Sequence, residues 1–254
     1  MTCAVRARGL TFGYAPGADV LDGLDLTVGH GERVAVLGPN GAGKTTLMLH
    51  LNGLLRGGGE LEVAGLPVGR DTLPALRARV GLVFQDPDDQ LFMTTVAEDV
   101  GFGPRNLGYD DEEVIARTAT ALRAVRMQHA ADRAPHQLSM GERRRVAIAG
   151  VLAMDPRLLV LDEPSANLDP RARRELLDLL ETLDRTLLVV THDLPFAAEL
   201  CERAVILSRG RIVADGPCSA ILGDTALLER HDLELPAGFD PSRVRRRSRP
   251  GSVR

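Results

Sequence analysis

The sequence contains Gly38-Pro39-Asn40-Gly41-Ala42-Gly43-Lys44-Thr45, followed by Thr46, and so matches the phosphate-loop pattern G-x-x-x-x-G-K-[ST] at every fixed position. An apolar run of strand length precedes it at residues 33–37, and residues 45–51 predict a helix after it. Glycines let successive N–H groups of such a turn face phosphate oxygens, and the helix N-terminus adds positive dipole. Lys44 brings a charge to the β- and γ-phosphates, and the Thr45 hydroxyl can ligate Mg²⁺. A strand, a glycine turn and a helix in this order favour a nucleotide site over a plain glycine-rich turn.

Length and composition indicate a globular protein of 254 residues, with one large domain or one domain carrying a small insertion. Apolar residues make up 44% and charged residues 26%, and the net charge of −4 gives no reason to expect a nucleic-acid binder. Cys3, Cys201 and Cys218 show no close pairing, which favours free thiols in a reducing compartment. The N-terminus lacks the apolar segment of a signal peptide, and the longest apolar run, residues 146–154, is too short to span a bilayer. Any membrane role is therefore expected to be peripheral.

Polar residues follow three apolar runs that predict buried strands. These are residues 80–84 with Gln85, residues 158–161 with Asp162 and Glu163, and residues 186–190 with Thr191 and His192. In open α/β sheets, ligands gather at the carboxyl ends of the strands. Adjacent carboxylates at a buried strand end are costly without a cation, so we expect Asp162 to hold Mg²⁺, directly or through water, and Glu163 to polarise an attacking water. The alternative for Asp162 and Glu163 is an acidic pair on the surface. His192 is expected to contact the γ-phosphate, although a lone histidine is more often structural.

The segments around these strands predict the rest of the core. Residues 3–30 predict short strands with turns, and Tyr14 at their tip could stack on an adenine ring or be an ordinary turn aromatic. Residues 165–170 predict a turn that caps the next helix, and residues 205–214 predict a hairpin.

A helical insertion is predicted between the strands, over about residues 86–155. Residues 110–134 have a broken apolar stripe, and Ser139 stands where an N-cap belongs, with Glu142 three residues on, as in a capping box. Residues 86–93 form an acidic loop that ends in Phe92 and Met93. This loop is either a docking surface for a partner helix or a solvated loop with Phe92 turned into the core.

The composition changes after residue 236. Residues 240–249 are rich in arginine and have no apolar period, which predicts a disordered tail over residues 237–254. Such a tail could lean on anionic lipid, or be a solvated end without a role.

Together these residues resemble the nucleotide-binding subunit of ABC transporters, over roughly residues 3–220. The family's Walker A loop corresponds to residues 38–46, Walker B to residues 158–162, the Q-loop to Gln85, the catalytic glutamate to Glu163, the D-loop to Ser165-Ala166-Asn167-Leu168-Asp169, the switch histidine to His192 and the adenine-stacking aromatic to Tyr14. The family signature LSGGQ corresponds to Leu138-Ser139-Met140-Gly141-Glu142, in which Met140 replaces a glycine and Glu142 a glutamine. Residues 83–92, 95–104 and 145–154 are similar to the energy-coupling-factor branch, whose members drive uptake of cobalt, nickel or vitamins.

The resemblance implies an α/β fold over residues 3–236, in which a P-loop NTPase core with a mostly parallel sheet carries an N-terminal antiparallel β subdomain and a helical signature subdomain. It implies ATP and Mg²⁺ as cofactors, with Thr45, Gln85 and Asp162 around the metal, and catalytic roles for Lys44, Gln85, Glu163 and His192. A second ATP-binding subunit, identical or different, would supply Ser139, Met140, Gly141 and Glu142 in trans, with Ser165 and Asp169 in the D-loop. An integral membrane subunit would dock near Asp86 to Phe92, which places the protein peripherally at the cytoplasmic face of the cell membrane.

Other readings of the same motifs are a soluble ABC ATPase in translation or DNA repair, or the motor of another ABC transporter class. Translation factors of that type usually carry two such domains in one chain and repair ATPases carry long coiled coils, and the sequence shows neither feature. A non-hydrolysing regulatory subunit is disfavoured by the intact Lys44, Asp162, Glu163 and His192.

Overall fold

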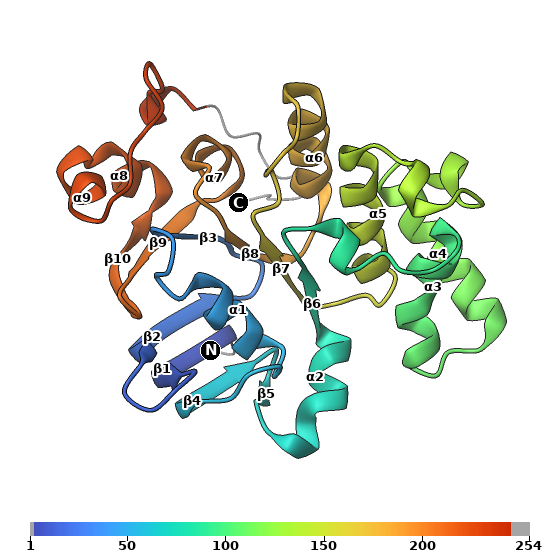
Figure 1. The fold of residues 1–254 in the computed structure, drawn as a ribbon, viewed down its shortest axis with the longest axis horizontal. Coiled ribbons are helices and arrows are strands. Elements are labelled where there is room, and N and C mark those ends of the chain that lie inside the picture. Colours follow the sequence, from blue (N-terminus) through green and yellow to red (C-terminus); the bar gives the residue numbers. More distant parts are fainter. Residues whose placement is uncertain (1–2, 245–254) are drawn as a thin grey trace, which may run out of the picture.

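The computed structural model describes residues 3–244, which form two β-sheets with helices around them (Figure 1). The larger sheet has six strands in the order β10-β9-β3-β8-β7-β6. Its neighbours pair in parallel except β10, which runs antiparallel to β9. The strands are β3 (Arg33–Leu37), β6 (Val80–Val83), β7 (Leu158–Asp162), β8 (Thr186–Val190), β9 (Arg203–Ser208) and β10 (Arg211–Pro217). The β9–β10 hairpin and the mostly parallel sheet agree with the sequence-based expectation.

The smaller sheet is antiparallel, in the order β2-β1-β4-β5, and contains β1 (Cys3–Gly13), β2 (Asp19–Gly29), β4 (Gly58–Val63) and β5 (Leu66–Pro67). The prediction of short strands for residues 3–30 is wrong, because β1 and β2 are each 11 residues long. Register shifts interrupt their pairing, one of them between Ala7 and Leu10, around Gly9 at φ +55°. Such bulges break the period-2 pattern in the sequence while the strand continues.

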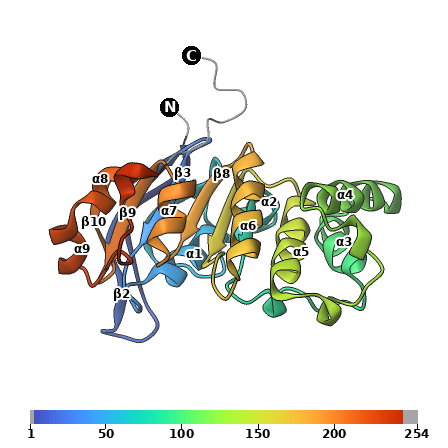
Figure 2. The same ribbon diagram turned by 90° about the horizontal axis from the view of Figure 1, so that it is seen from above.

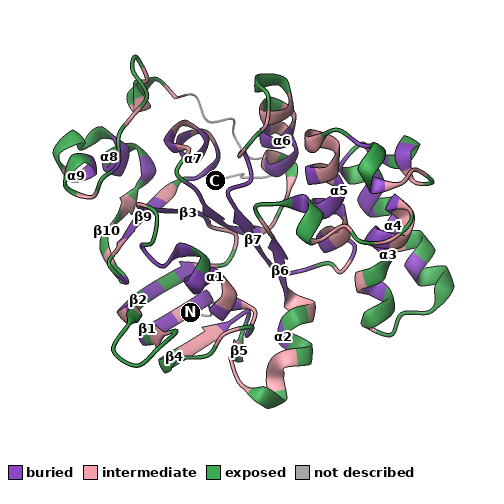
Figure 3. Cartoon of the chain, in the orientation of Figure 1, coloured by how far each residue is buried: buried purple, intermediate pink, exposed green. Residues whose placement is uncertain are grey.

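Successive residues of the parallel strands face two different hydrophobic cores, as the strand period of two requires. Val34 and Val36 of β3 join a core with the small sheet and helix α1 (Lys44–Leu51). Ala35 and Leu37 join a second core with α6 (Pro170–Thr182) and α7 (Leu194–Leu200) on the opposite face. Figure 3 shows the resulting continuous burial of the central strands. Because these strands are parallel and buried on both faces, their carboxyl ends meet at one edge of the sheet. Polar side chains that follow the strands there can be shielded from water.

Three helices lie between β6 and β7 in sequence and form one end of the molecule (Figure 2). They are α3 (Val96–Asn106), α4 (Asp111–Ala124) and α5 (Met140–Leu152), and they follow α2 (Leu73–Arg79), which leads into β6. Asp110 caps α4 by accepting a hydrogen bond from the Glu113 N–H. Helix α5, the last of the three, packs against β6 and α6 of the core.

The C-terminal segment continues to pack beyond residue 236. Helices α8 (Cys218–Gly223) and α9 (Thr225–Arg230) are followed by Phe239 and Val244, which pack against the second core. The predicted disorder is therefore wrong for residues 237–244, because isolated apolar residues anchor a segment whose charge pattern suggested solvation. The rest of the predicted tail, residues 245–254, lies outside the described residues. Within residues 3–244, no helix combines the length and apolar character needed to cross a membrane.

Candidate nucleotide-binding site

The loop between β3 and α1 has a shape that its glycines impose. Gly38 has φ +152°, and a Cβ there would lie 2.1 Å from the Leu207 carbonyl oxygen. Gly43 has φ +103°, and a Cβ there would lie 2.8 Å from the Val20 carbonyl oxygen. Gly43 also stands at the N-cap of α1, where no side chain caps the helix. The loop thus presents a helix N-terminus with no side-chain cap, which suits a bound anion.

Lys44 is the only lysine in the sequence and lies inside this loop, with a relative exposure of 8%. Its Nζ donates to the carbonyl oxygens of Gly38 at 2.7 Å and Pro39 at 3.0 Å. Burial lowers the pKa of Lys44, while the charges of Glu163 and Asp162 oppose that shift. A single buried ammonium held by two neutral carbonyls has spare capacity for an anionic ligand.

Asp162 at the end of β7 accepts a hydrogen bond from the Thr45 hydroxyl at 3.3 Å. Burial raises the pKa of Asp162, and so does the neighbouring Glu163, whereas Thr45, Lys44 and Arg144 lower it. A carboxylate and a hydroxyl are hard oxygen donors of the kind Mg²⁺ prefers. Residues 3–244 contain no group of three or more His, Cys, Asp or Glu side chains placed to hold a metal. The pair therefore fits Mg²⁺ that keeps most of its ligands from water and phosphate, as Mg²⁺ usually does.

Glu163 is 7% exposed and is fixed by the segment after β8. Its Oε2 accepts a hydrogen bond from the Thr191 hydroxyl at 2.9 Å, and its Oε1 lies 2.7 Å from Nδ1 of His192. The His192 N–H also donates to this carboxylate, at 3.1 Å. Because a carboxylate only accepts, Nδ1 carries the proton in this pair. The structure thus brings together Glu163 and His192, which the sequence placed at the ends of two different strands.

Gln85 follows β6 at the same edge of the sheet but is exposed, and its side chain makes no hydrogen bond within the described residues 3–244. The glutamine that holds this loop is Gln90. Its Oε1 accepts from the Phe84 N–H at 2.8 Å, and its Nε2 donates to the Leu82 carbonyl oxygen at 3.2 Å. Gln90 was not predicted from the sequence, and only its place in the acidic loop could have indicated its role.

Tyr14 lies beside the start of α1. Its hydroxyl is 3.3 Å from Oγ1 of Thr46, and its ring packs edge-to-face on Phe12, with centroids 5.0 Å apart. Phe12 makes a second edge-to-face contact with the buried His50 of α1, at 4.8 Å. Tyr14 is well exposed, so one ring surface next to the loop is open to a planar ligand.

The predicted signature forms the N-terminus of α5. Ser139 caps the helix, and Glu142 reaches back to it in a capping box, as expected. The Ser139 hydroxyl donates to Oε2 of Glu142 at 2.8 Å. Hydrogen bonds from the backbone and the hydroxyl of Ser139 lower the pKa of Glu142, so this helix end carries a carboxylate. A Cβ at Gly141 would lie 2.9 Å from the Cβ of Ala172 on α6, so the glycine allows close packing there.

The signature faces a hollow of about 310 Å³ that it shares with the start of α6. Met140 and Asp169 line it, and Asp169 caps α6 by accepting from the N–H groups of Arg171 and Ala172. None of the phosphate-loop residues line this hollow, and Figures 1 and 2 show α5 well separated from α1. The signature and the phosphate loop of one chain therefore form two separate surfaces.

Ser165 connects the loop after β7 to the loop after β8. Its hydroxyl donates to Oδ2 of Asp193 at 2.9 Å. Arg173 of α6 donates to the same oxygen at 3.1 Å and to Glu199 at 3.0 Å. Asp193 also caps α7 and directly follows His192. Asp193 and Arg173 were not predicted from the sequence, because their roles depend on contacts between distant segments.

The acidic loop ends at an apolar groove of about 590 Å³ between β6, α3 and α5. Phe92 is 61% exposed and stacks edge-to-face on Phe102 of α3, with centroids 4.9 Å apart. Asp99 holds the chain here by accepting from the N–H groups of Phe92 and Met93, both at 3.0 Å. The alternative that Phe92 is turned into the core is therefore wrong.

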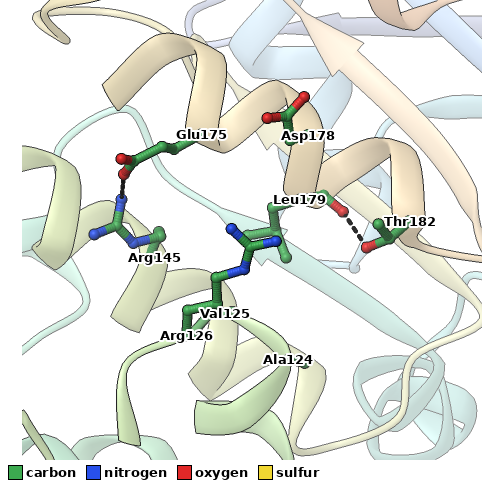
Figure 4. A pocket seen from close by; sticks show the side chains of 8 residues that line it. All are labelled: Ala124, Val125, Arg126, Arg145, Glu175, Asp178, Leu179 and Thr182. Atoms are coloured by element: carbon green, nitrogen blue, oxygen red, sulfur yellow. Dashed lines mark hydrogen bonds and ion pairs between the residues drawn. The ribbon is translucent and has the colours of Figure 1, made fainter. Parts of the chain in front are cut away.

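A smaller pocket of about 280 Å³ lies between the end of α4, α5 and α6 (Figure 4). Arg145 of α5 crosses its rim to Glu175 of α6, at 2.7 Å. None of the phosphate-loop residues lines this pocket. It lies where the helices α4 and α5 meet α6 of the core.

Comparison with known proteins agrees with this geometry. The family model described as ABC transporter matches residues 21–166, which is more than half of the chain. The chain belongs to the ABC transporter family. It is an ATP-binding subunit of that family, whose members hydrolyse ATP to drive transport.

Three relatives cover nearly the whole chain. A Streptomyces coelicolor protein, provisionally named an ABC transporter ATP-binding protein, is 61% identical over 95% of this chain and 94% of its own length. The energy-coupling factor transporter ATP-binding protein EcfA of Carboxydothermus hydrogenoformans is 46% identical, over 93% of this chain and 88% of its own. The cobalt import ATP-binding protein CbiO of Rhodobacter capsulatus is 47% identical, over 98% and 91%. The predicted resemblance to the energy-coupling-factor and cobalt branch is confirmed.

Two solved structures share the fold. The structure of cbiO1 from Clostridium perfringens, part of the ABC transporter complex cbiONQ, has a TM-score of 0.81 and 34% identity, covering 93% of this chain and 97% of that one. A dimeric ATP-binding cassette bound to ADP and Pi has a TM-score of 0.75 and 28% identity, covering 84% and 98%. The predicted α/β P-loop fold is confirmed by these matches.

Proposed function

We propose that this ABC ATPase is the motor subunit of an importer of the energy-coupling-factor type, which takes up a cobalt or nickel ion or a vitamin. The names of the relatives EcfA and CbiO support this class of importer. The observation that carries the proposal is the exposed groove at Phe92. This groove lies at the far end of the loop that starts at Gln85. A docking surface on that loop links the hydrolysis site to a membrane partner.

ATP is expected to bind at the phosphate loop. Lys44 exchanges its two carbonyl partners for β- and γ-phosphate oxygens, and the N–H groups around Gly43 donate to the same phosphates. Tyr14 stacks on the adenine with its exposed ring face. The contact between Tyr14 and Thr46 supports this arrangement, because it fixes the ring next to the phosphate end.

Mg²⁺ would be held by Thr45 and Asp162, with Gln85 brought in when the loop closes. The bound metal neutralises charge on the phosphates. The Thr45–Asp162 hydrogen bond supports the assignment, because it already joins the two donors. Gln85 has no side-chain partner among the described residues, which leaves it free to turn toward the nucleotide.

Hydrolysis would use Glu163 to orient and polarise water against the γ-phosphate. His192 and Thr191 hold the Glu163 carboxylate by three kinds of donor, a ring N–H, a backbone N–H and a hydroxyl. Positioning of this kind supplies most of the catalysis of phosphoryl transfer, since little covalent chemistry is required of the protein. His192 would then contact the γ-phosphate with its second ring nitrogen.

A second ATP-binding subunit, taken here as a copy of this chain, would complete each site. Its Ser139 and Gly141 face the γ-phosphate, with Met140 and Glu142 beside them, while its D-loop from Ser165 to Asp169 lines the interface. The separation of the signature from the phosphate loop supports this, because a single chain cannot use both on one nucleotide. The dimeric cassette with a similar fold supports it as well.

The membrane subunit would dock in the groove beside Phe92, holding the chain peripherally at the cytoplasmic face of the membrane. Phe92→Asp should abolish capture of an integral membrane protein from detergent-solubilised membranes of the source organism, because a carboxylate in the groove opposes burial by an apolar partner. The matched control is Ile115→Asp on α4, since Ile115 is also strongly exposed, at 68%, but lies outside the groove. Equal recovery of the membrane partner with Phe92→Asp, or no membrane protein bound to the wild type, would contradict the proposal.

A further inference from the structure

Three consecutive arginines follow the signature, and each reaches a different part of the molecule. Arg143 pairs with Asp88 in the acidic loop at 3.2 Å, and Arg145 pairs with Glu175 of α6 at 2.7 Å. Arg144 lies between them and is only 1% exposed, among the largest fully buried side chains of the described chain. It is the member of the triplet that has no carboxylate partner in an ion pair among residues 3–244.

Arg144 is held by two backbone carbonyls from loops that are far apart in sequence. One terminal nitrogen donates to the Phe84 oxygen at 2.9 Å, and the other reaches the Ala166 oxygen at a longer 3.4 Å. Its Nε has no hydrogen-bond partner within the described part of the chain. Burial lowers the pKa of Arg144, while the charges of Asp86 and Asp162 oppose the shift. A guanidinium remains charged even so, and burying a charge with an unsatisfied donor is costly to the free energy of folding.

The two carbonyls belong to loops that surround the nucleotide site. Phe84 directly precedes Gln85, and Ala166 directly follows Ser165. Ser165 donates to Asp193, which is the neighbour of His192 in the sequence, and His192 holds Glu163. A single side chain on the signature helix is therefore bonded to both loops that flank the hydrolytic residues.

We propose that Arg144 is a positioning residue for ATP hydrolysis, which makes the loops at Phe84 and Ala166 move as one body with the N-terminal part of helix α5. When α5 shifts against the nucleotide of a partner copy, Arg144 carries the Gln85 loop with it. Through Ala166, Ser165 and Asp193 the same shift reaches the segment that holds His192. Occupancy of the signature in one site is thereby coupled to the geometry of Glu163 in the other.

The inference rests on the proposed roles of Gln85, Ser139 and Glu163 but does not depend on the substrate or the membrane partner. ATP binding and hydrolysis by the wild-type chain test those roles separately. A failure confined to Arg144 variants therefore remains distinguishable from failure of the proposed function.

The experiment compares Arg144→Met with Arg33→Met in the full-length chain. Arg33 is a matched control, because it is also buried and donates to two backbone carbonyls, those of Glu181 at 2.8 Å and Leu183 at 3.1 Å. It starts β3, at the opposite end of that strand from the phosphate loop. Each variant is assayed for melting temperature, ATP affinity, kcat, and hydrogen exchange of residues 85–91 and 166–169.

Both substitutions should lower the melting temperature, but only Arg144→Met should lower kcat, by about tenfold or more with ATP affinity within about twofold of wild type. Amide exchange in residues 85–91 and 166–169 should become faster only in Arg144→Met. Arg144→Lys keeps the charge but loses the two-pronged fork, so its kcat should lie between those of the wild type and Arg144→Met.

Three results would overturn the inference: a kcat for Arg144→Met within about twofold of wild type, an equal loss of kcat in Arg33→Met, or unchanged exchange in both segments. If Arg144→Met does not fold, Arg144→Lys decides the question. A reduced kcat in that variant at unchanged ATP affinity supports a positioning role, and a wild-type kcat rejects it.

Discussion

The phosphate loop with its neighbouring strand end differs from the signature face in the burial of its polar side chains and in the groups that hold them. At the phosphate loop and the end of β7 beside it, Lys44, Asp162 and Glu163 are all buried and hydrogen-bonded within the chain. At the signature face, Ser139 is exposed, and its hydroxyl is engaged by Glu142 of the same helix. The first surface therefore has buried, fixed charged groups, whereas the second has an exposed hydroxyl that a carboxylate of its own helix engages.

Under the proposed function, this difference suits the two surfaces to different parts of the reaction. Buried, fixed groups suit the electrostatic work of hydrolysis, because they need little reorganisation when charge develops. An exposed helix N-terminus that is capped by its own carboxylate suits reversible contact with a phosphate from another chain. Substitutions at the phosphate loop should therefore have large effects, and substitutions at the signature should have smaller effects that depend on pairing.

The largest expected effect is on turnover, in Glu163→Gln. The amide keeps the shape of the side chain but cannot act as a base, so kcat should fall by about 100-fold or more while ATP affinity is retained. Steady-state ATPase assays and equilibrium ATP binding measure the two quantities. Glu229→Gln at an exposed position on α9 is the control and should behave as the wild type. Undiminished hydrolysis in Glu163→Gln would remove this residue from its role and weaken the contrast between the two surfaces.

The next effect is on binding, in Lys44→Ala. Loss of charge-assisted hydrogen bonds to phosphate should weaken ATP affinity by about 10- to 100-fold. Because Lys44 is the only lysine, an amine-selective reagent can modify only Lys44 and the chain's N-terminal amine. ATP should protect Lys44 from that reagent. Unchanged affinity in Lys44→Ala, together with no protection by ATP, would mean that the phosphates bind elsewhere.

The smallest effect is expected at the signature, in Glu142→Gln. The substitution removes a negative charge beside an incoming phosphate and leaves Ser139 with a weaker internal acceptor. Pairing in the presence of ATP should become tighter by a few-fold, since a charge at a helix terminus contributes up to about 1 kcal/mol. Sedimentation across a range of protein concentrations measures the pairing. Weaker pairing would show that the Glu142 carboxylate helps the contact instead of opposing it.

The strand ends and loops of the core could be predicted because their chemistry is local. The glycine pattern around Lys44 fixes a loop shape, and apolar runs that end in Asp162 or His192 predict buried strands with polar ends. The capping box of Ser139 and Glu142 is likewise a pattern of four residues, and the structure contains it. Such features need no knowledge of which segments meet in space.

The features that escaped prediction depend on contacts between distant segments. Arg144 donates to backbone carbonyls that are 60 and 22 residues away in the sequence. Every residue has a backbone carbonyl, so the residue types at these positions give no sign of the contact. Gln90 and Asp193 act on backbone or side-chain groups whose positions only the fold determines. The long β1 and β2 strands were missed because bulges interrupt their alternation, and the packing of Phe239 was missed because an arginine-rich run follows it in the sequence.

The most direct test of ATP-dependent pairing is the mass of the Glu163→Gln variant in solution, measured by sedimentation with ATP and with ADP. A hydrolysis-deficient chain should pair when ATP bridges its phosphate loop to a partner's Ser139, and it should separate with ADP, which lacks the γ-phosphate. Adding Ser139→Arg to Glu163→Gln should keep the chain monomeric even with ATP. We expect the Glu163→Gln variant to be a dimer with ATP and a monomer with ADP, and the same mass with both nucleotides would contradict pairing through the γ-phosphate.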